Sequence, residues 1–235
     1  MPFLLDLETV GSTNTVFSRG ATPPPFSIVL THHQTEGRGR RDRQWISKPG
    51  ESLALSVLVP RELIESDTAS WIPLIAGLSV VSALHELGVT EVGVKWPNDV
   101  LVAGNKIAGI LCEVLPTKDV VVGVGINIGF ESEPPTPNAS ALDQHCEIAE
   151  GTPDEFVSSF VSFLRSFLAG DRKITQQLVE ETMLTLRRQV EVVESEGPRW
   201  RGTATGLDST GALLVRDETG MTRVVSAADV EHLLQ

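Results

Sequence analysis

Cysteine and aromatic residues are scarce in this chain of 235 residues, and tyrosine is absent. Two cysteines, Cys112 and Cys146, cannot build a disulfide framework, so we expect a reducing, cytoplasmic environment. Aromatic residues make up 5% of the chain and hydrophobic residues 41%, so the core is expected to be mainly aliphatic. This composition excludes a disulfide-rich secreted domain and an intrinsically disordered chain.

Long apolar runs and an excess of positive charge are also missing. The longest uninterrupted apolar stretches, such as 120–124, fall far short of the roughly 20 residues that a membrane helix needs, and no signal-peptide pattern is found. We therefore expect no membrane partner. Because 19 Lys and Arg stand against 31 Asp and Glu, the formal net charge is −12, which argues against binding of nucleic acid.

The pattern of apolar and turn residues predicts a mixed α/β (α+β) domain followed by a small β domain. Four short strands between 92 and 128 follow one another too closely for crossover helices, so we expect them to pair antiparallel. From about residue 188 the pattern changes to short alternating segments separated by turn clusters. The expected domains are therefore 1–187 and 188–235. Three apolar or amphipathic stretches predict helices, over 67–87, 152–170 and 172–187.

Positive charge is concentrated in one glycine-containing segment, Gly37-Arg38-Gly39-Arg40-Arg41-Asp42-Arg43. Guanidinium groups match phosphate and carboxylate oxygens, and the two glycines allow a ligand to approach the backbone closely. The residues alone leave two interpretations open, a nucleotide phosphate site and a solvated basic loop. A polynucleotide site would need a wider basic surface than this composition supplies.

Three further segments place polar groups at the ends of predicted elements. Lys95-Trp96-Pro97-Asn98-Asp99 ends a strand with a lysine that either enters a cleft or lies along the surface. Gly123-Val124-Gly125-Ile126-Asn127 ends a strand on an amide, but it lacks the context of a dinucleotide-binding fold. Gly11-Ser12-Thr13-Asn14 places three hydrogen-bonding side chains at a helix start, which is more than capping requires.

Taken together, these segments resemble the biotin protein ligases, which attach biotin to biotin carboxyl carrier proteins. The resemblance extends from about residue 4 to the C-terminus. It implies a catalytic domain of the biotin/lipoate ligase type, with a largely antiparallel sheet and packed helices, and a small C-terminal SH3-like β-barrel. Asp42 departs from the family pattern, which usually has glycine there. The matching positions are 11–14, Gln34, 37–41, 95–99, 106–109 and 123–127.

The resemblance implies a reaction in two steps. Biotin and ATP first give biotinyl-5′-AMP and pyrophosphate, and the biotinyl group then passes to one lysine of a carrier domain. The first step brings two anions together, so the site must supply positive charge, which Mg²⁺ and the arginines would provide. Lys95 and Arg40 are implied as the catalytic residues, with Lys95 clamping the biotin carboxylate against the α-phosphate.

The same resemblance assigns residues to each ligand. Those implied for biotin are Ser12, Thr13, Asn14, Gln34, Arg38, Gly39, Arg40, Lys95 and Gly109. Those implied for ATP and the adenylate are Arg38, Arg40, Arg41, Arg43, Trp45, Asn98, Lys106 and Asn127, with Asn127 facing the adenine. No protein metal site is predicted, since Mg²⁺ would be carried by the phosphates, with Asp99 as a candidate ligand.

Three alternatives were weighed against this interpretation. A lipoate ligase shares the fold, but the Arg-Arg-x-x-Gly-Gly-Gly-x-Val run that it usually shows does not occur here. A ligase that is also a repressor needs an N-terminal winged helix, for which a motif beginning at Gly11 leaves no room. A non-catalytic nucleotide sensor would keep the arginines without needing Lys95. The expected protein is a monomer or homodimer that acts on biotin, ATP and a carrier domain.

Overall fold

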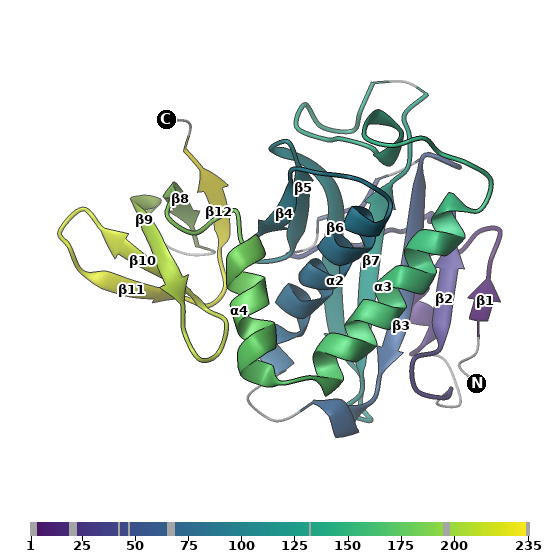
Figure 1. Ribbon diagram of the computed structural model, residues 1–235, viewed down its shortest axis with the longest axis horizontal. Helices are drawn as coiled ribbons and strands as arrows, with labels where there is room; N and C mark the ends of the chain where they lie inside the picture. Colours follow the sequence, from purple (N-terminus) through teal and green to yellow (C-terminus); the bar gives the residue numbers. More distant parts are fainter. Residues whose placement is uncertain are drawn as a thin grey trace.

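The computed structural model describes residues 4–18, 23–41, 43–46, 48–64, 69–131, 133–194 and 198–233. Two sheets dominate these residues, one of seven strands and one of five. Figure 1 shows helices packed over one face of the larger sheet, with the smaller sheet beside it and the two chain ends far apart. Asp42, the departure from the family pattern, lies outside the described residues.

The larger sheet has the strand order β1-β2-β3-β7-β6-β5-β4. β1 and β2 pair parallel, and every other neighbouring pair is antiparallel. The antiparallel run predicted between 92 and 128 is therefore confirmed. Its strands are β1 Leu4–Asp6, β2 Ile28–Thr31, β3 Ser52–Val59, β4 Val92–Lys95, β5 Asp99–Val102, β6 Asn105–Val114 and β7 Val120–Asn127.

Helix α2 is the core helix of this domain. The segment Ala69–Glu86 has the length and apolar composition of a membrane-crossing helix, but 67% of it is buried inside this protein. It packs against α3, α4 and the strands β4 and β6, which explains why apolar residues occupy nearly all of its faces. The α-helices are α1 Thr13–Val16, α2 Ile72–Glu86, α3 Thr152–Ala169 and α4 Arg172–Thr182.

Helix α4 ends earlier than the sequence pattern predicts. It stops at Thr182, five residues before the predicted end at 187, because Met183 adopts an extended conformation and forms a parallel bridge with Val94. The amide of Leu184 then donates to the Val94 carbonyl at 2.8 Å. The chain between the two sheets therefore runs along β4 before it enters the second sheet.

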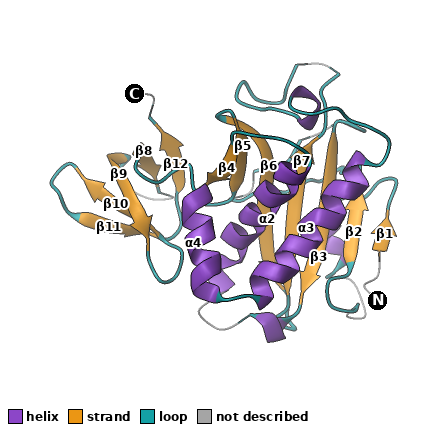
Figure 2. Ribbon diagram, viewed as in Figure 1, coloured by secondary structure: helices purple, strands orange, loops and turns teal. Residues whose placement is uncertain are grey.

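The smaller sheet is entirely antiparallel, in the order β11-β10-β9-β8-β12. Figure 2 shows this region as strands and turns, as the alternating pattern predicts. The last strand was not predicted, because Asp-Val-Glu-His contains one apolar residue and so carries almost no pattern. The strands are β8 Gln189–Val193, β9 Trp200–Leu207, β10 Leu213–Asp217, β11 Thr222–Val225 and β12 Asp229–His232.

The turn between β9 and β10 docks on the larger domain. The indole N–H of Trp71 donates to the carbonyl of Ser209 at 2.9 Å, and that of Trp96 donates to the carbonyl of Gly211 at 3.1 Å. Both indole rings are buried. Apolar surface and paired donors thus hold the two domains together, and one of these tryptophans belongs to the Lys95–Asp99 motif.

Candidate active site

One pocket of about 240 Å³ collects most of the residues singled out in the sequence. It lies between the start of α1, the arginine loop (residues 37–43, of which the structure describes all but Asp42), the β4–β5 turn, strands β6 and β7, and strand β12 of the smaller domain. Two implied ligand residues, Arg41 and Asn127, are not in its lining. Those that line it are Ser12, Thr13, Asn14, Gln34, Arg38, Gly39, Arg40, Arg43, Trp45, Lys95, Asn98, Asp99, Lys106 and Gly109.

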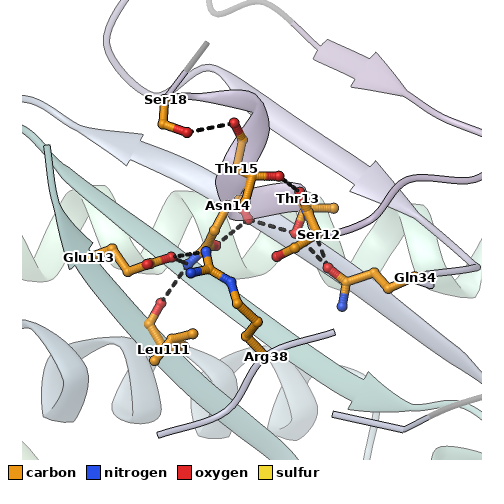
Figure 3. A network of polar contacts seen from close by, with 10 residues as sticks. Ser12, Thr13, Asn14, Thr15, Ser18, Gln34, Arg38, Leu111 and Glu113 are labelled. Carbon is orange, nitrogen blue, oxygen red and sulfur yellow. Dashed lines mark hydrogen bonds and ion pairs between the residues drawn. The ribbon is translucent and has the colours of Figure 1, made fainter. Parts of the chain in front are cut away.

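The polar end of the pocket is built around Asn14 (Figure 3). Its amide nitrogen donates to Glu113 Oε2 at 2.7 Å and to the Leu111 carbonyl at 3.2 Å, and its oxygen accepts from Ser56 at 2.6 Å. A Cβ on Gly123 would lie 2.3 Å from that oxygen. Gly123 therefore makes room for Asn14, which explains one glycine of its motif.

Thr13 and Gln34 form a second part of this network. Gln34 Oε1 accepts from the Thr13 amide at 2.9 Å and from the Thr13 hydroxyl at 3.3 Å. Ser12 stands at the N-cap of α1, but its side chain makes no capping hydrogen bond. Ser12, Thr13 and Asn14 thus line the pocket, whereas Thr15 donates to the Ser12 carbonyl within the first turn.

Glu113 holds two of the implied biotin residues. The same Oε2 that accepts from Asn14 also receives Arg38 Nη2 at 2.7 Å, in a partly exposed ion pair. Sequence reasoning missed Glu113 and Ser56. Each is a polar residue within the mainly apolar part of its strand, and that exception to the pattern was the available signal.

The arginine loop is closed by its own backbone. The Gly39 amide donates to the Arg43 carbonyl at 2.7 Å, and the Trp45 amide donates to the Gly37 carbonyl at 2.9 Å. Arg40 Nη1 donates to Asn98 Oδ1 at 3.3 Å. Burial lowers the pKa of the Arg40 guanidinium, which nevertheless stays cationic. A partly desolvated cation at this place favours an anionic ligand.

The other arginines of the loop contact the smaller domain. Arg41 donates to the carbonyls of Ala227 at 2.8 Å and Val193 at 3.3 Å, and it lies 3.4 Å from Asp229. Arg43 forms an ion pair with the same carboxylate. Arg41 also has a φ of 54°, in the left-handed region that non-glycine residues rarely adopt. These contacts make Arg41 an anchor of the loop, whereas the resemblance assigned it to the phosphates.

The indole ring of Trp45 packs directly against two glycines of the larger sheet. Gly109 and Gly125 are direct partners across β6 and β7. A Cβ atom added to Gly109 would lie 3.2 Å from the indole, and one added to Gly125 would lie 2.6 Å from it. Lys106, which pairs with Asp99 at 2.6 Å, stands 5.7 Å from the ring centroid. The indole N–H is buried without a hydrogen-bond partner. A buried unpaired donor is costly, so a ligand acceptor here would be favoured.

Lys95 ends β4 at the pocket wall and is half-buried. Within the described part of the chain, no carboxylate forms an ion pair with it, in contrast to Lys106. Its ammonium is therefore available to an anionic ligand.

Asn127 has a different environment from the one implied for it. Its side chain is buried and donates to the Ser140 carbonyl at 2.9 Å. This contact ties the end of β7 to the following loop, outside the pocket. Among the described residues no group of three or more His, Cys, Asp and Glu side chains could hold a metal ion.

The pocket is locally positive in an acidic protein. Five cationic residues and three acidic residues line it, whereas the whole chain has a net charge of −12. Such a concentration of positive charge favours the binding of anionic groups such as carboxylates and phosphates. The cations are Arg38, Arg40, Arg43, Lys95 and Lys106, and the acids are Asp99, Asp229 and Glu231.

Comparisons with known proteins place these features in context. Residues 7–130 match the Biotin/lipoate A/B protein ligase family, and residues 185–233 match the Biotin protein ligase C terminal domain. A Mycobacterium tuberculosis protein named Biotin--[acetyl-CoA-carboxylase] ligase is 35% identical, over 95% of this chain and 86% of its own length. The Bifunctional ligase/repressor BirA of Bacillus subtilis is 27% identical, over 88% and 66%.

The fold is also shared with solved structures. The structure of a biotin protein ligase from Aquifex aeolicus in complex with biotin and ATP superposes with a TM-score of 0.84 at 25% identity. It covers 99% of this chain and 100% of that one. Both domains described above are therefore present in that protein.

Proposed function

The chain belongs to the biotin/lipoate A/B protein ligase family and is a biotin protein ligase; from this premise we propose an ATP-dependent, AMP-forming mechanism. Biotin is activated as biotinyl-5′-AMP and is then transferred to a lysine of a biotin carboxyl carrier domain. The observation that carries the proposal is the single pocket that combines the polar end around Asn14 with Lys95, Arg40 and Arg43. A carboxylate and a triphosphate could meet there.

The polar end of the pocket suits the ureido ring of biotin. That ring presents two N–H donors and one carbonyl acceptor, and the side chains at the start of α1 supply both acceptors and donors within a small volume. Their own hydrogen bonds to Gln34, Ser56 and Glu113 fix their orientations before a ligand arrives. Such pre-organisation lowers the entropic cost of binding.

The cations would act during adenylation. An oxygen of the biotin carboxylate attacks the α-phosphorus, the bond to the bridging oxygen breaks, and pyrophosphate leaves with the electron pair. No proton is transferred in this step. Lys95 and Arg40 would reduce the repulsion between the carboxylate and the phosphate and stabilise the charge that develops on the phosphoryl oxygens. They would act as electrostatic groups and form no covalent bond.

Mg²⁺ would reach the site with the phosphates. The carboxylate of Asp99 lines the pocket and is the donor that would hold it, since Mg²⁺ commonly binds one or two carboxylates together with substrate phosphates. When bound, the ion would neutralise charge on the triphosphate. In transfer, the neutral ε-amine of the carrier lysine attacks the biotinyl carbonyl, the bond between the carbonyl carbon and the phosphate oxygen breaks, AMP leaves with the electron pair, and the nitrogen loses a proton to solvent. We place this reaction in the cytoplasm, because the chain has two cysteines and neither is in a disulfide.

Two assays test the proposal. Biotin with Mg-ATP should release pyrophosphate without a carrier, and mass spectrometry should then show one biotinyl group on one lysine of an added carrier domain. Lipoate in place of biotin is the matched control. Pyrophosphate release driven by lipoate and not by biotin would contradict the substrate assignment, and binding without release would leave a non-catalytic sensor.

A further inference from the structure

The peptide group that follows Lys95 is held by a buried threonine. The amide of Trp96 donates to Thr185 Oγ1 at 2.9 Å, and Thr185 is 0% exposed. The same hydroxyl lies 3.0 Å from Nε2 of His232. Two hydrogen bonds, the first buried and the second partly buried, thus join the backbone of the Lys95–Asp99 motif to the last residue of β12.

The path of the main chain explains why these residues meet. After α4 the chain runs along β4, since Met183 bridges Val94 and the Leu184 amide donates to the Val94 carbonyl. Thr185 is the next residue, one step further along, and therefore reaches the peptide after Lys95. β12 pairs with β8, and this pairing brings His232 against Thr185. The contact thus lies where the chain passes from one domain to the other.

The imidazole of His232 is suited to act as an uncharged hydrogen-bonding group with a fixed orientation. Burial, followed by the charges of Lys95 and Arg188, lowers the pKa of His232 to about 4. The ring is consequently uncharged at neutral pH and adds no positive charge near the lysine. The Thr185 hydroxyl accepts from the Trp96 amide and keeps its own proton and a second lone pair, either of which can pair with Nε2 of His232, so contacts on both sides fix the orientation of the hydroxyl.

We propose that Thr185 and His232 are positioning residues for Lys95: the hydroxyl orients the peptide that follows the lysine, and the imidazole orients the hydroxyl. The smaller domain thereby contributes to the placement of the catalytic cation without touching a substrate. The inference rests on the proposed role of Lys95 in adenylation. A displacement of about 1 Å in a catalytic group can reduce a rate by about 100-fold, so one buried contact at this place matters.

The first test compares two substitutions of similar size. Thr185→Val removes the hydroxyl and keeps the shape, whereas Thr185→Ser keeps the hydroxyl. We expect Thr185→Val to lower kcat for biotin-dependent pyrophosphate release by about tenfold and to raise KM for biotin by a smaller factor, because Lys95 would stabilise the charge that develops during adenylation more than it binds the ground-state carboxylate. Thr185→Ser should stay within about twofold of the native rate. Thermal melting of both variants monitors folding.

The second test asks whether the effect passes through Lys95. In a Lys95→Ala background, Thr185→Val should cause no further loss, because the group that it positions is gone. His232→Leu should lower kcat by a similar factor, and the double variant Thr185→Val/His232→Leu should be no slower than Thr185→Val alone. The control is Ser70→Ala, which removes another hydrogen bond between the domains, to the Thr210 carbonyl at 2.6 Å, and should leave kcat unchanged.

Two outcomes would overturn the inference while leaving the proposed function intact. One is a native kcat in Thr185→Val. The other is an equal loss of rate in the native and Lys95→Ala backgrounds, which would indicate a general loss of stability. If the native protein releases no pyrophosphate with biotin, the proposed function itself fails, so the two failures are distinguishable.

Discussion

Lys95 is the single side chain on which the proposed adenylation step depends most. Its ammonium forms no ion pair with a carboxylate in the described part of the chain, so its whole charge is available to the substrates. Removing one pre-organised group that stabilises developing charge usually lowers a rate by about 10²- to 10³-fold. We expect this loss in pyrophosphate release for Lys95→Ala, with an unchanged melting temperature. A native rate would show that Lys95 is a surface lysine without a catalytic role.

Glu113 is a single carboxylate that serves two residues of the pocket. Glu113→Gln keeps the size of the side chain but removes the negative charge. The oxygen of Glu113 that bears this charge pairs with Arg38 and accepts a hydrogen bond from Asn14. Hydrogen bonds to charged groups are worth about 1.5–3 kcal/mol, so we expect KM for biotin to rise by about tenfold or more. KM for ATP should rise less, because only Arg38 of the two partners is also implied for ATP.

A matched substitution controls for loss of charge alone. Glu191→Gln removes a carboxylate that also receives two cationic donors, from Arg199 and Arg201, but on the smaller sheet. It should leave both KM values unchanged. Equal effects of the two substitutions would mean that Glu113 has no special relation to biotin.

The arginine loop is the element whose behaviour the structure most directly predicts. Asp229 pairs with both Arg41 and Arg43, and Arg43 is largely exposed. Exposed ion pairs contribute at most about 1 kcal/mol, or about fivefold in a conformational equilibrium. Asp229→Asn should therefore increase the rate of tryptic cleavage after the loop arginines by a few fold in the free protein. Biotin with ATP should slow cleavage, because carboxylate and phosphate oxygens would bind the arginines that line the pocket.

Another carboxylate in the smaller domain provides the comparison. Asp217 pairs with Arg223 at 2.8 Å, away from the loop, so Asp217→Asn should leave cleavage at the loop unchanged. Cleavage that is unaltered by both Asp229→Asn and the ligands would indicate a rigid loop.

Elements with strong periodicity were predictable from the sequence, and elements defined by partners were not. Strands β4 to β7 and helices α2 and α3 follow from apolar spacing and capping residues. The early end of α4 and the existence of β12 depend on pairing with β4 and β8, which leaves little trace in a local pattern. The helix propensity of residues 183–187 supports a longer helix, but the parallel bridge between Met183 and Val94 ends the helix before them.

The residues of the candidate site also fall into a group that the sequence predicts and a group that it does not. Residues within contiguous motifs, such as Asn14, Arg40 and Lys95, were identified because small and charged groups cluster along the sequence. Glu113 and Asp229 were missed because their pocket partners are 99 and 186 positions away. Long-range pairs of this kind become visible only when the sheets are assembled.

At the scale of the whole molecule, the two domains form one catalytic unit. The smaller domain supplies Asp229 to the arginine loop, His232 to Thr185 and the Gly211 carbonyl to Trp96. Removing residues 188–235 should therefore lower the rate of adenylation and expose Trp71 and Trp96. We expect a soluble protein with impaired ligation and a lower melting temperature, measured by pyrophosphate release and calorimetry. Full activity of the truncated protein would make the smaller domain dispensable.

The packing of Trp45 against Gly109 and Gly125 also has a consequence for the intrinsic fluorescence of the protein. The chain has no tyrosine and four tryptophans, so all of its near-ultraviolet emission comes from indole rings. Trp71 is buried in the contact between the domains, Trp96 is 3% exposed although it lines the pocket, and Trp200 stacks with Arg223 on the smaller sheet. Trp45 is the ring that rests on Gly109 and Gly125 inside the pocket, with a lysine nearby to quench or shift its emission. Occupancy of the pocket should thus change the intrinsic fluorescence, and Trp45→Phe should abolish most of that change without any added dye.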